Sequence, residues 1–415
     1  MTAPVRIPFP VVDEVSRHCL QEEEPETVHI EVHLPGPVDQ MRLRKAFTEA
    51  LHRHPRILMR EARGPWYRRR YEWELTPEPD VEVVTFAPPG PRALQDARTR
   101  ALTEAPPLSV SPPIRLEVVD SVLFLTINHT ALDGPACLRV LATAAELYGG
   151  RDNAPAAPPV RPAEPRQESS DTPTTWSPPA RVAPGTPDPS PGNGMLVTEL
   201  PLPHRPKGSP YTVNDQLMVT TALTIAHWNR EHGARPRPLR ITMPVDDRPR
   251  DTTMPIGNGT RLVEVPFTPS ELNHPDMTAL LRRTAERTRA LKALPRPQLG
   301  HGAALLTAPW APVAARAALT RTLRRAAAPW TSTTLLSNIG RIPYPLDFGE
   351  ETGRAHAVWF SAPARMPRGL TVTTASTAGR LHLALRWSRA LLSHGDGAHL
   401  RDLFEHYLHT TEVTP

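Results

Sequence analysis

Hydrophobic and polar residues alternate over several short segments in the N-terminal part of the chain. The pattern is clearest in residues 28–34, Val-His-Ile-Glu-Val-His-Leu, and it recurs in residues 114–119 and 122–127. A period of two puts the apolar side chains on one face of a β-sheet, so each segment is predicted to be a half-buried strand. Only Asp120 and Ser121 separate the last two segments, which predicts a tight β-hairpin.

In other segments the apolar positions recur every three or four residues, which is typical of amphipathic helices. Such helices are expected at 39–55, 92–104, 135–149, 212–233, 276–293, 313–327 and 397–408. Thr212 and Asp215 are spaced as a capping box at the start of one of them. Further strands are expected at 67–75, 239–245, 333–336, 355–361, 370–375 and 381–387. We interpret the run Arg68-Arg69-Arg70 as a solvated edge of the first of these strands rather than as an anion site.

Between residues 149 and 194 the periodic pattern disappears, and proline, alanine, serine, aspartate and threonine dominate. Such a segment cannot bury enough apolar surface to form a core, so it is expected to be a linker. We therefore divide the chain into an N-terminal lobe (1–150), a proline-rich interlobe linker (151–196) and a C-terminal lobe (197–415). Strands and helices interleave in both lobes, and the hairpins argue against wholly parallel sheets. The predicted class is α/β (α+β) with mixed sheets.

The composition narrows the classes of function. A chain of 415 residues can bury more than one core. Its 48 basic and 43 acidic residues give a net charge of +5, but the two signs are interspersed. Nucleic-acid binding calls for a clustered basic face, so no nucleic-acid partner is expected. Cys19 and Cys137 lack metal-binding spacing and fit a reduced, cytoplasmic protein. The N-terminus has no signal-peptide pattern, and no apolar run approaches the roughly 18 residues of a membrane span.

Several common catalytic motifs are missing from the sequence. Gly257-Asn258-Gly259 does not lie between a strand and a helix with the spacing of a phosphate-binding loop. The chain contains neither a Gly-x-Ser-x-Gly elbow nor a His-Glu-x-x-His helix. Cys137 lies inside a helical pattern, which favours a small buried side chain over a nucleophile.

His129 is the strongest candidate for a catalytic group. It continues the apolar face of the strand 122–127, so its side chain is expected to emerge where that strand ends and the core opens. Asp133 and Gly134 follow in the loop, and they suit a tight turn that fixes an imidazole and lets a substrate come close. Two plainer interpretations stay open: His129 can be a hydrogen-bonded structural residue, and Asp133 can cap the following helix.

The segment Asn128-His129-Thr-Ala-Leu-Asp133-Gly134 resembles the His-His-x-x-x-Asp-Gly signature of the superfamily of condensation domains and chloramphenicol-acetyltransferase-like acyltransferases. This superfamily includes stand-alone polyketide-associated acyltransferases. Further stretches resemble family positions in the same order, at 36–55, 112–116, 214–215, 243–248, 257–258, 337–340 and 347–349. The resemblance covers most of the chain apart from the linker. Its main departure is Asn128, which stands where the family usually has its first histidine.

The resemblance implies two chloramphenicol-acetyltransferase-like lobes, each a mixed sheet backed by helices, with the active-site tunnel between them. It also implies that His129 takes the proton from an acceptor group or positions that acceptor. Asn128 cannot share the work, because an amide is not a base at neutral pH.

The same resemblance assigns roles to other residues. Asp133 would pair with Arg248 of the other lobe in a structural ion pair, and Gly134 would allow the turn of the motif. Ser337 and Asn338 are candidates for contacting the substrate and donating a hydrogen bond to the oxyanion that forms during acyl transfer. No metal site is expected.

The implied function is a stand-alone acyltransferase of specialised, natural product metabolism. It would move an acyl group from a thioester, either acyl-CoA or an acyl or peptidyl group on a phosphopantetheinyl carrier protein, to a hydroxyl or amine of a small-molecule acceptor. The product would be an ester or an amide. No bound cofactor is expected, and the protein is expected to be a monomer.

Two other functions stay open: a cyclisation or rearrangement in the same pocket, and non-catalytic docking of a carrier protein. The arginines at 282–289 and 321–325 are interpreted as solvated helix faces. Contact with an acidic carrier or with CoA phosphates is the alternative.

Overall fold

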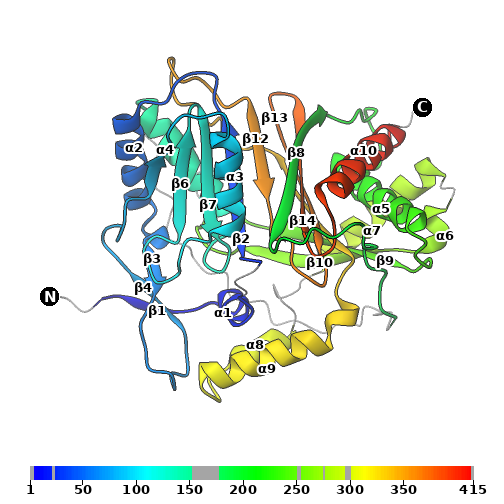
Figure 1. Ribbon diagram of the computed structural model, residues 1–415, viewed down its shortest axis with the longest axis horizontal. Coiled ribbons are helices and arrows are strands. Elements are labelled where there is room, and N and C mark those ends of the chain that lie inside the picture. The colour runs from blue at the N-terminus through cyan, green and yellow to red at the C-terminus, as the bar shows by residue number, and fades with distance from the viewer. Residues whose placement is uncertain are drawn as a thin grey trace.

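The computed structural model describes residues 4–20, 24–151, 177–249, 254–273, 276–294 and 301–412. Two large β-sheets stand side by side, one in each lobe, and helices cover them (Figure 1). A third, smaller sheet lies below the N-terminal lobe, and three helices lie below the region where the lobes meet (Figure 1). The two-lobed architecture with mixed sheets that the sequence predicts is therefore confirmed.

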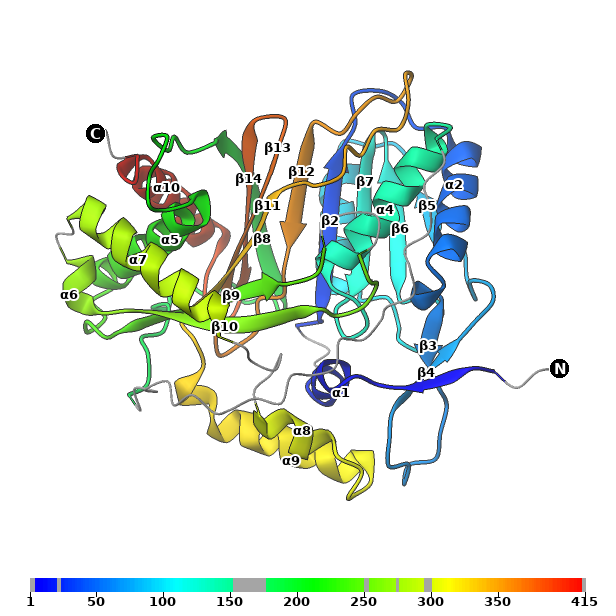
Figure 2. The same cartoon turned by 180° about the vertical axis from the view of Figure 1, so that it is seen from behind.

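The N-terminal lobe is built on a sheet with the order β12-β2-β7-β6-β5. Its strands are β2 (Thr27–His33), β5 (Val84–Phe86), β6 (Ile114–Val119), β7 (Val122–Asn128) and β12 (Ala357–Ser361). Leu123 and Leu125 of β7 face the main core, whereas Phe124 faces a smaller cluster with Ala97. Helices α2 (Gln40–Arg53) and α4 (Gly134–Tyr148) cover the first face (Figure 2), and α3 (Ala93–Thr103) covers the second (Figure 1). The predicted hairpin is confirmed, because Val119 pairs with Val122.

The C-terminal lobe is built on a sheet with the order β10-β9-β11-β13-β14-β8. Its strands are β8 (Asn193–Pro201), β9 (Leu239–Asp246), β10 (Thr260–Phe267), β11 (Thr334–Arg341), β13 (Leu370–Thr377) and β14 (Arg380–Ser388). β11 runs parallel to β9 and β13, and the other pairs are antiparallel. Its helices are α5 (Val213–Glu231), α6 (Pro269–Leu272), α7 (Met277–Ala293) and α10 (His394–Thr410). The predicted capping box of Thr212 and Asp215 opens α5.

A smaller layer closes the underside of the molecule. It contains β1 (Arg6–Pro8), β3 (Met59–Glu61), β4 (Glu72–Leu75), α1 (Val11–His18), α8 (His301–Thr307) and α9 (Val313–Ala326), together with the short helices η1 (Pro55–Ile57) and η2 (Ala328–Trp330). The buried guanidinium of Arg316 in α9 forms an ion pair with Glu14 of α1. His18 Nδ1 lies 3.2 Å from the hydroxyl of Thr320. Helix α9 of the C-terminal half is thus tied to the N-terminal helix.

Strand β12 connects the two lobes in a different way. It lies in the segment that the sequence assigns to the C-terminal lobe, yet it pairs antiparallel with β2 at the edge of the N-terminal sheet. Val358 pairs with Val32 and Phe360 with Ile30, and all four side chains are buried. Each sheet therefore depends on residues from the C-terminal half of the chain.

Several boundaries differ from the sequence-based prediction. The strand expected at 67–75 begins only at Glu72, because Arg68 turns back to donate to the carbonyl of Ala62 at 2.7 Å and stacks over Tyr71. The sequence-based prediction missed helices α1, α6 and α8 and strands β1, β3, β5, β8 and β10. Strand β8 starts inside the range expected for the linker, and residues 152–176 of that linker lie outside the described residues. Across the described ranges, none of the helices combines the length and hydropathy that crossing a bilayer requires.

Candidate active site

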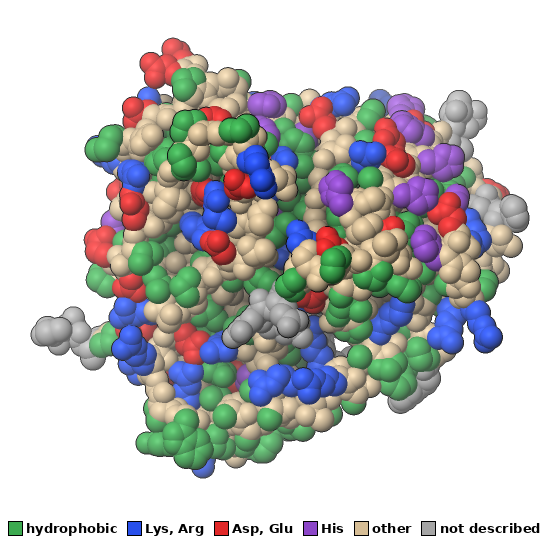
Figure 3. Space-filling view, viewed as in Figure 1, with side chains coloured by type: hydrophobic (Ala, Val, Ile, Leu, Met, Phe, Trp, Pro, Cys, Tyr) green, Lys and Arg blue, Asp and Glu red, His purple; other side chains and the backbone are tan. Residues whose placement is uncertain are grey.

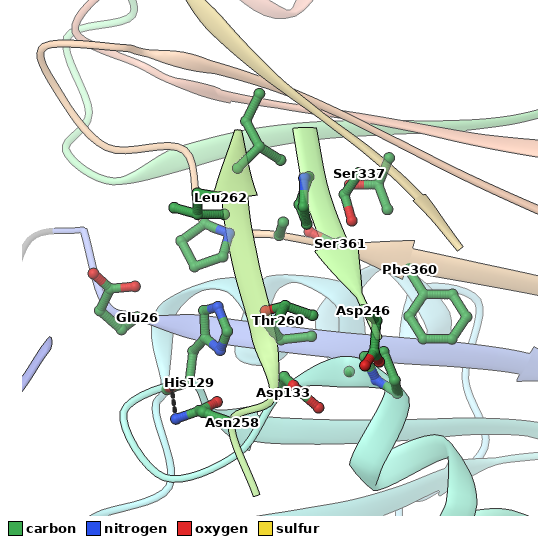
Figure 4. A pocket seen from close by; sticks show the side chains of 18 of the residues that line it. Glu26, His129, Asp133, Asp246, Asn258, Thr260, Leu262, Ser337, Phe360 and Ser361 are labelled. Atoms are coloured by element: carbon green, nitrogen blue, oxygen red, sulfur yellow. Dashed lines mark hydrogen bonds between the residues drawn. The ribbon is translucent and has the colours of Figure 1, made fainter. Parts of the chain in front are cut away.

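A cavity of about 490 Å³ opens between the lobes, and residues from both lobes line it (Figure 4). The N-terminal lobe contributes α1, the start of β2, the loop between β7 and α4, and the first turns of α4. The C-terminal half contributes β9, β10, β11, β12 and the segment that follows β12. Apolar side chains predominate in the lining, among them Val15, Val28, Leu138, Leu335 and Phe360. This is the composition of a cavity that receives an organic ligand.

His129 lies just past the end of β7 and its half-buried ring faces this cavity (Figure 4). Its backbone N–H donates to the carbonyl of Glu26 at 2.8 Å, and its Nδ1 lies 3.1 Å from the carbonyl oxygen of Leu132. A carbonyl oxygen can only accept a hydrogen bond, so in the neutral ring Nδ1 carries the proton. Nε2 then keeps its lone pair and can accept a proton from a molecule in the cavity.

Asn128 precedes the histidine but does not line the cavity. Its buried side-chain amide donates to the carbonyl of Pro106 at 2.9 Å, and its side-chain oxygen accepts from the backbone N–H of Thr130 at 3.1 Å. These bonds satisfy both ends of the amide and close the loop in which His129 lies. In this chain, the first position of the motif contacts the protein rather than the cavity contents.

Asp133 is buried at the N-terminus of α4, and both of its carboxylate oxygens have protein partners. Oδ1 accepts from the backbone N–H of Ala136 at 3.0 Å, and Oδ2 accepts from Nη2 of Arg248 at 2.7 Å and from the backbone N–H of Gly259 at 2.9 Å. The structure thus brings Asp133 and Arg248 together across the two lobes. Asp133 also caps α4, so the capping interpretation and the ion pair hold at once.

Arg248 is shared by two carboxylates. Its Nε and Nη2 donate to Asp246 at 2.9 and 2.8 Å, in addition to the bond from Nη2 to Asp133, and its Nη1 donates to the carbonyl of Gly257 at 2.8 Å. Burial lowers the pKa of the guanidinium, but the neighbouring charges of Asp133 and Asp246 outweigh burial and the pKa is raised. Arg248 is therefore a fully bonded, permanently charged link between the lobes.

Two glycines allow the close packing around this link. A Cβ on Gly134 would lie 3.3 Å from the ring of Phe360 in β12. A Cβ on Gly259 would lie 2.3 Å from Nε of Arg248, closer than any side chain tolerates. Glycine at these positions lets α4 approach β12 and lets the backbone of Gly259 reach Asp133.

Asp13 and Asn258 support the loop of His129 from behind. Asn258 Nδ2 donates to Asp13 at 2.9 Å and to the carbonyls of Thr130 and His129 at 3.1 and 3.4 Å (Figure 4). Trp73 Nε1 donates to the other oxygen of Asp13 at 2.8 Å. Burial raises the pKa of Asp13 to about 6, even though both hydrogen bonds act in the opposite direction. Asp13 was not among the predicted site residues, because helix α1 itself was not predicted.

Ser337 and Asn338 line the same cavity from β11, and in Figure 4 Ser337 stands away from the His129 ring. The amide of Asn338 donates to Asn214 at 3.2 Å, and its oxygen accepts from Thr374 at 3.1 Å. No described residue hydrogen-bonds to the hydroxyl of Ser337. Of the two candidates, Ser337 is the one with a side chain available to a ligand.

The remaining sequence-based candidates are not catalytic centres. Cys137 is buried inside α4, and burial raises the pKa of its thiol, so it is a poor nucleophile. Within the described ranges, histidine, cysteine and carboxylate side chains do not gather in any group of three or more that could hold a metal ion.

Comparison with known proteins identifies the architecture. No protein-family model matches the sequence. The starter condensation domain of the rhizomide synthetase RzmA, solved in complex with C8-CoA, superimposes with a TM-score of 0.66 at 14% identity, and the match covers 98% of this chain and 95% of that domain. The chain has the condensation-domain fold. The same fold is found in the trichothecene 15-O-acetyltransferase TRI3 from Fusarium sporotrichioides, with a TM-score of 0.65, 11% identity and coverage of 99% and 96%.

At the level of sequence, the chain is similar to the uncharacterized protein Rv2305 of Mycobacterium tuberculosis (strain ATCC 25618 / H37Rv). The two are 29% identical over 381 residues, which is 82% of this chain and 84% of the relative. The superpositions on the solved structures confirm the condensation-domain fold that the motif of His129 predicts. Sequence identities of 11–14% to these solved structures support the fold alone.

Proposed function

We propose that the protein is an acyltransferase that moves an acyl group from a thioester to a hydroxyl or amine acceptor. The observation that carries the proposal is the state of His129: its Nδ1 is bonded to the Leu132 carbonyl, and its ring faces a largely apolar cavity. A neutral imidazole with a free Nε2, in a cavity suited to an organic acyl chain, is what a general base for acyl transfer needs.

In the proposed reaction, Nε2 of His129 takes the proton of the acceptor as the acceptor oxygen or nitrogen attacks the thioester carbonyl. The tetrahedral intermediate collapses, the carbon–sulfur bond breaks, and the leaving thiolate takes the proton from the imidazolium. No acyl-enzyme forms, and holding donor and acceptor together in one cavity supplies much of the rate. Leu132 stabilises the imidazolium, because its carbonyl accepts from Nδ1 throughout.

The tetrahedral intermediate carries a negative oxygen that requires a hydrogen-bond donor. We propose Ser337 for this role, because its hydroxyl lines the cavity and has no hydrogen-bond partner among the described residues. Asp133 and Arg248 take no direct part in this proposal. Their charged groups are saturated by protein contacts, so their role is to hold the loop of His129 against the C-terminal lobe.

The donor would be an acyl-CoA or an acyl or peptidyl group on a phosphopantetheinyl carrier protein. The complex of the RzmA starter condensation domain with C8-CoA supports a CoA-borne acyl group, and the name of TRI3 supports transfer to oxygen. Both are properties of those proteins. For this chain we propose a small-molecule acceptor, an ester or amide product of natural product metabolism, and action as a cytoplasmic monomer with lobes at 1–150 and 197–415.

Replacement of His129 tests the proposal. The protein is incubated with a panel of acyl-CoA thioesters and hydroxyl or amine acceptors, and the products are read by mass spectrometry together with thiol release. His129→Ala should fold normally and lower turnover by about 100-fold or more, the range of a lost general base. The exposed His52→Ala variant on α2 is the matched control and should keep full turnover.

The outcomes separate the proposal from its alternatives. A gain in acceptor mass equal to the acyl group supports transfer. A product of unchanged mass would instead indicate cyclisation or rearrangement. If the wild-type protein turns over none of the thioesters, and both wild type and His129→Ala bind a carrier protein, the protein is a docking module.

A further inference from the structure

The charged residues that line the cavity divide into two groups. Glu26 forms an ion pair with Arg365, and Asp133 and Asp246 share Arg248. Each of these three carboxylates is therefore neutralised by an arginine. Arg324 and Arg368 also line the cavity, but no carboxylate of the described residues forms an ion pair with either of them.

Among the described residues, only hydroxyl groups accept hydrogen bonds from the guanidinium of Arg368. Its Nε donates to Ser332 at 3.2 Å and its Nη2 to Thr242 at 3.5 Å, the second bond being long. Burial, together with the charges of Arg324 and Arg181, lowers the pKa of Arg368 to about 10, and the charge of Glu264 opposes that effect only in part. A guanidinium has five N–H donors, so two hydroxyl contacts leave part of its donor capacity for a ligand.

The surroundings of Arg368 are basic. Arg181 lies near enough for its charge to act on Arg368, and its own guanidinium is occupied by the backbone carbonyls of Pro367 and Ala328. Arg324 projects from the exposed face of α9 into the cavity lining. In the space-filling view, basic side chains form a row along α9, beside the hollow between this helix and the two lobes (Figure 3). The cavity is therefore polarised, with its uncompensated positive charge at the side of α9.

We propose that Arg368, assisted by Arg324, forms a subsite for an anionic oxygen group, a phosphate or a carboxylate, carried by one of the two substrates that meet at His129. The proposal rests on the proposed acyl transfer and specifies one of its substrates. A half-buried guanidinium without a carboxylate is costly, and an oxyanion that bonds to it would offset that cost. Arginine suits this role because its planar fork matches phosphate and carboxylate oxygens.

Two sources of the anion are possible chemically: the phosphate of a pantetheine-type thioester donor, or a carboxylate on the acyl chain or acceptor. Calorimetric titration with two probe pairs distinguishes them. The first pair is 4′-phosphopantetheine and pantetheine, and the second is octanoate and methyl octanoate. In each pair only one member carries the anion.

The titrations use the full chain as wild type, Arg368→Gln, Arg324→Gln and the control Arg92→Gln, which removes an exposed charge at the start of α3. Wild type and Arg92→Gln should bind the anionic member of one pair more tightly than its neutral partner. Arg368→Gln should lower the affinity for that anionic probe by about tenfold or more, which is the effect of losing one charged hydrogen bond. Arg324→Gln should have a smaller effect, Arg368→Lys should restore part of the affinity, and circular dichroism checks that each variant folds.

Preference for 4′-phosphopantetheine that disappears in Arg368→Gln supports a phosphate, and the same result with octanoate supports a carboxylate. Wild-type protein that discriminates within neither pair, or an anion preference that survives in Arg368→Gln, overturns the subsite. Repeating the titration with His129→Ala separates the two proposals. Anion binding in that variant is expected to be unchanged, so a failure of acyl transfer and a failure of the anion subsite give different results.

Discussion

The environment of His129 is made almost entirely by main-chain groups. The carbonyl of Leu132 fixes its ring, and the carbonyl of Glu26 fixes its backbone N–H. The side chain of Asn258 donates to the carbonyls of His129 and Thr130. Main-chain contacts survive most side-chain substitutions in the loop. What they require is that the loop itself stays in place, and that depends on Asp133 and Arg248.

Removing one member of this ion pair should unfold the loop rather than only slow the chemistry. Asp133→Asn keeps the shape of the side chain but leaves the buried Arg248 with one carboxylate fewer, and a broken buried pair costs about 3–5 kcal/mol. We expect a lower midpoint of thermal unfolding, measured by calorimetry, and a loss of activity with it. His129→Ala should lose activity at an unchanged midpoint. An Asp133→Asn protein with wild-type stability would show that the pair is dispensable.

At the scale of elements, the contact of α9 with α1 is the feature that closes the cavity from below. Arg316 is completely buried, and besides its ion pair with Glu14 it donates to the carbonyls of Arg69 and Ala311. A single side chain therefore fastens α9 to the N-terminal helix and to the segment before β4. The exposed face of the same helix carries Arg324, so the position of the proposed anion subsite depends on this buried contact.

Arg316→Met should release α9 from the N-terminal lobe. The variant keeps the bulk of the side chain but leaves Glu14 buried without its partner, which predicts local opening of α8 and α9. Hydrogen exchange followed by mass spectrometry should show faster exchange in residues 301–326 and in α1, with little change in the β14–β8 pair. The exposed Arg325→Met variant on the same helix is the control. Uniform acceleration over the whole chain would contradict local opening.

The helices and strands also show which parts of the fold can be predicted from the sequence. Long amphipathic helices such as α5 and alternating strands such as β6 and β7 carry their own pattern, and the structure confirms them. Helix α1 has only eight residues, too few for a clear helical period, and β8 begins inside the proline-rich range whose composition predicts a linker. The pairing of β12 with β2 depends on which edge is left open in the folded lobe, and local periodicity contains no such information.

For the site, the motif predicted the loop of His129 and the partnership of Asp133 with Arg248, which the structure brings together at 2.7 Å. It did not predict Asp13, Glu26 or Arg368. These residues come from an unpredicted helix, a strand start and a loop after β12, and they meet the cavity only because the lobes are packed in this way. The role of each candidate in catalysis stays a prediction.

At the scale of the whole molecule, buried titratable groups predict how stability depends on pH. Burial, together with nearby arginines, lowers the pKa of His29 to about 3 and that of His54 to about 4, from 6.5 in a free histidine. Below about pH 6.5 the unfolded chain therefore binds protons that the native protein does not, and stability falls as the pH falls. Asp13 acts in the opposite sense between about pH 6 and 3.8, because its native pKa is raised.

Burial also lowers the pKa of His382, so three histidines act against one carboxylate. The free energy of unfolding should therefore decrease as the pH falls from 6.5 to 5, with a slope of up to about 1.4 kcal/mol per pH unit for each histidine. Urea unfolding at half-unit steps of pH measures this slope. His54→Gln removes one titrating group while keeping a hydrogen-bonding side chain next to Thr143, and it should flatten the curve. A slope in that variant equal to the wild-type slope would contradict the assignment to His54.

The pairing of β12 with β2 also constrains how the protein is made. A ribosome delivers β2, β6 and β7 early, but the strand that covers the outer edge of β2 is synthesised only after most of the C-terminal lobe. Until then the N-terminal lobe carries an open strand edge, which invites pairing with other chains. The N-terminal lobe can therefore complete its sheet only after the C-terminal half has been synthesised. We expect the two lobes to complete folding together rather than one after the other.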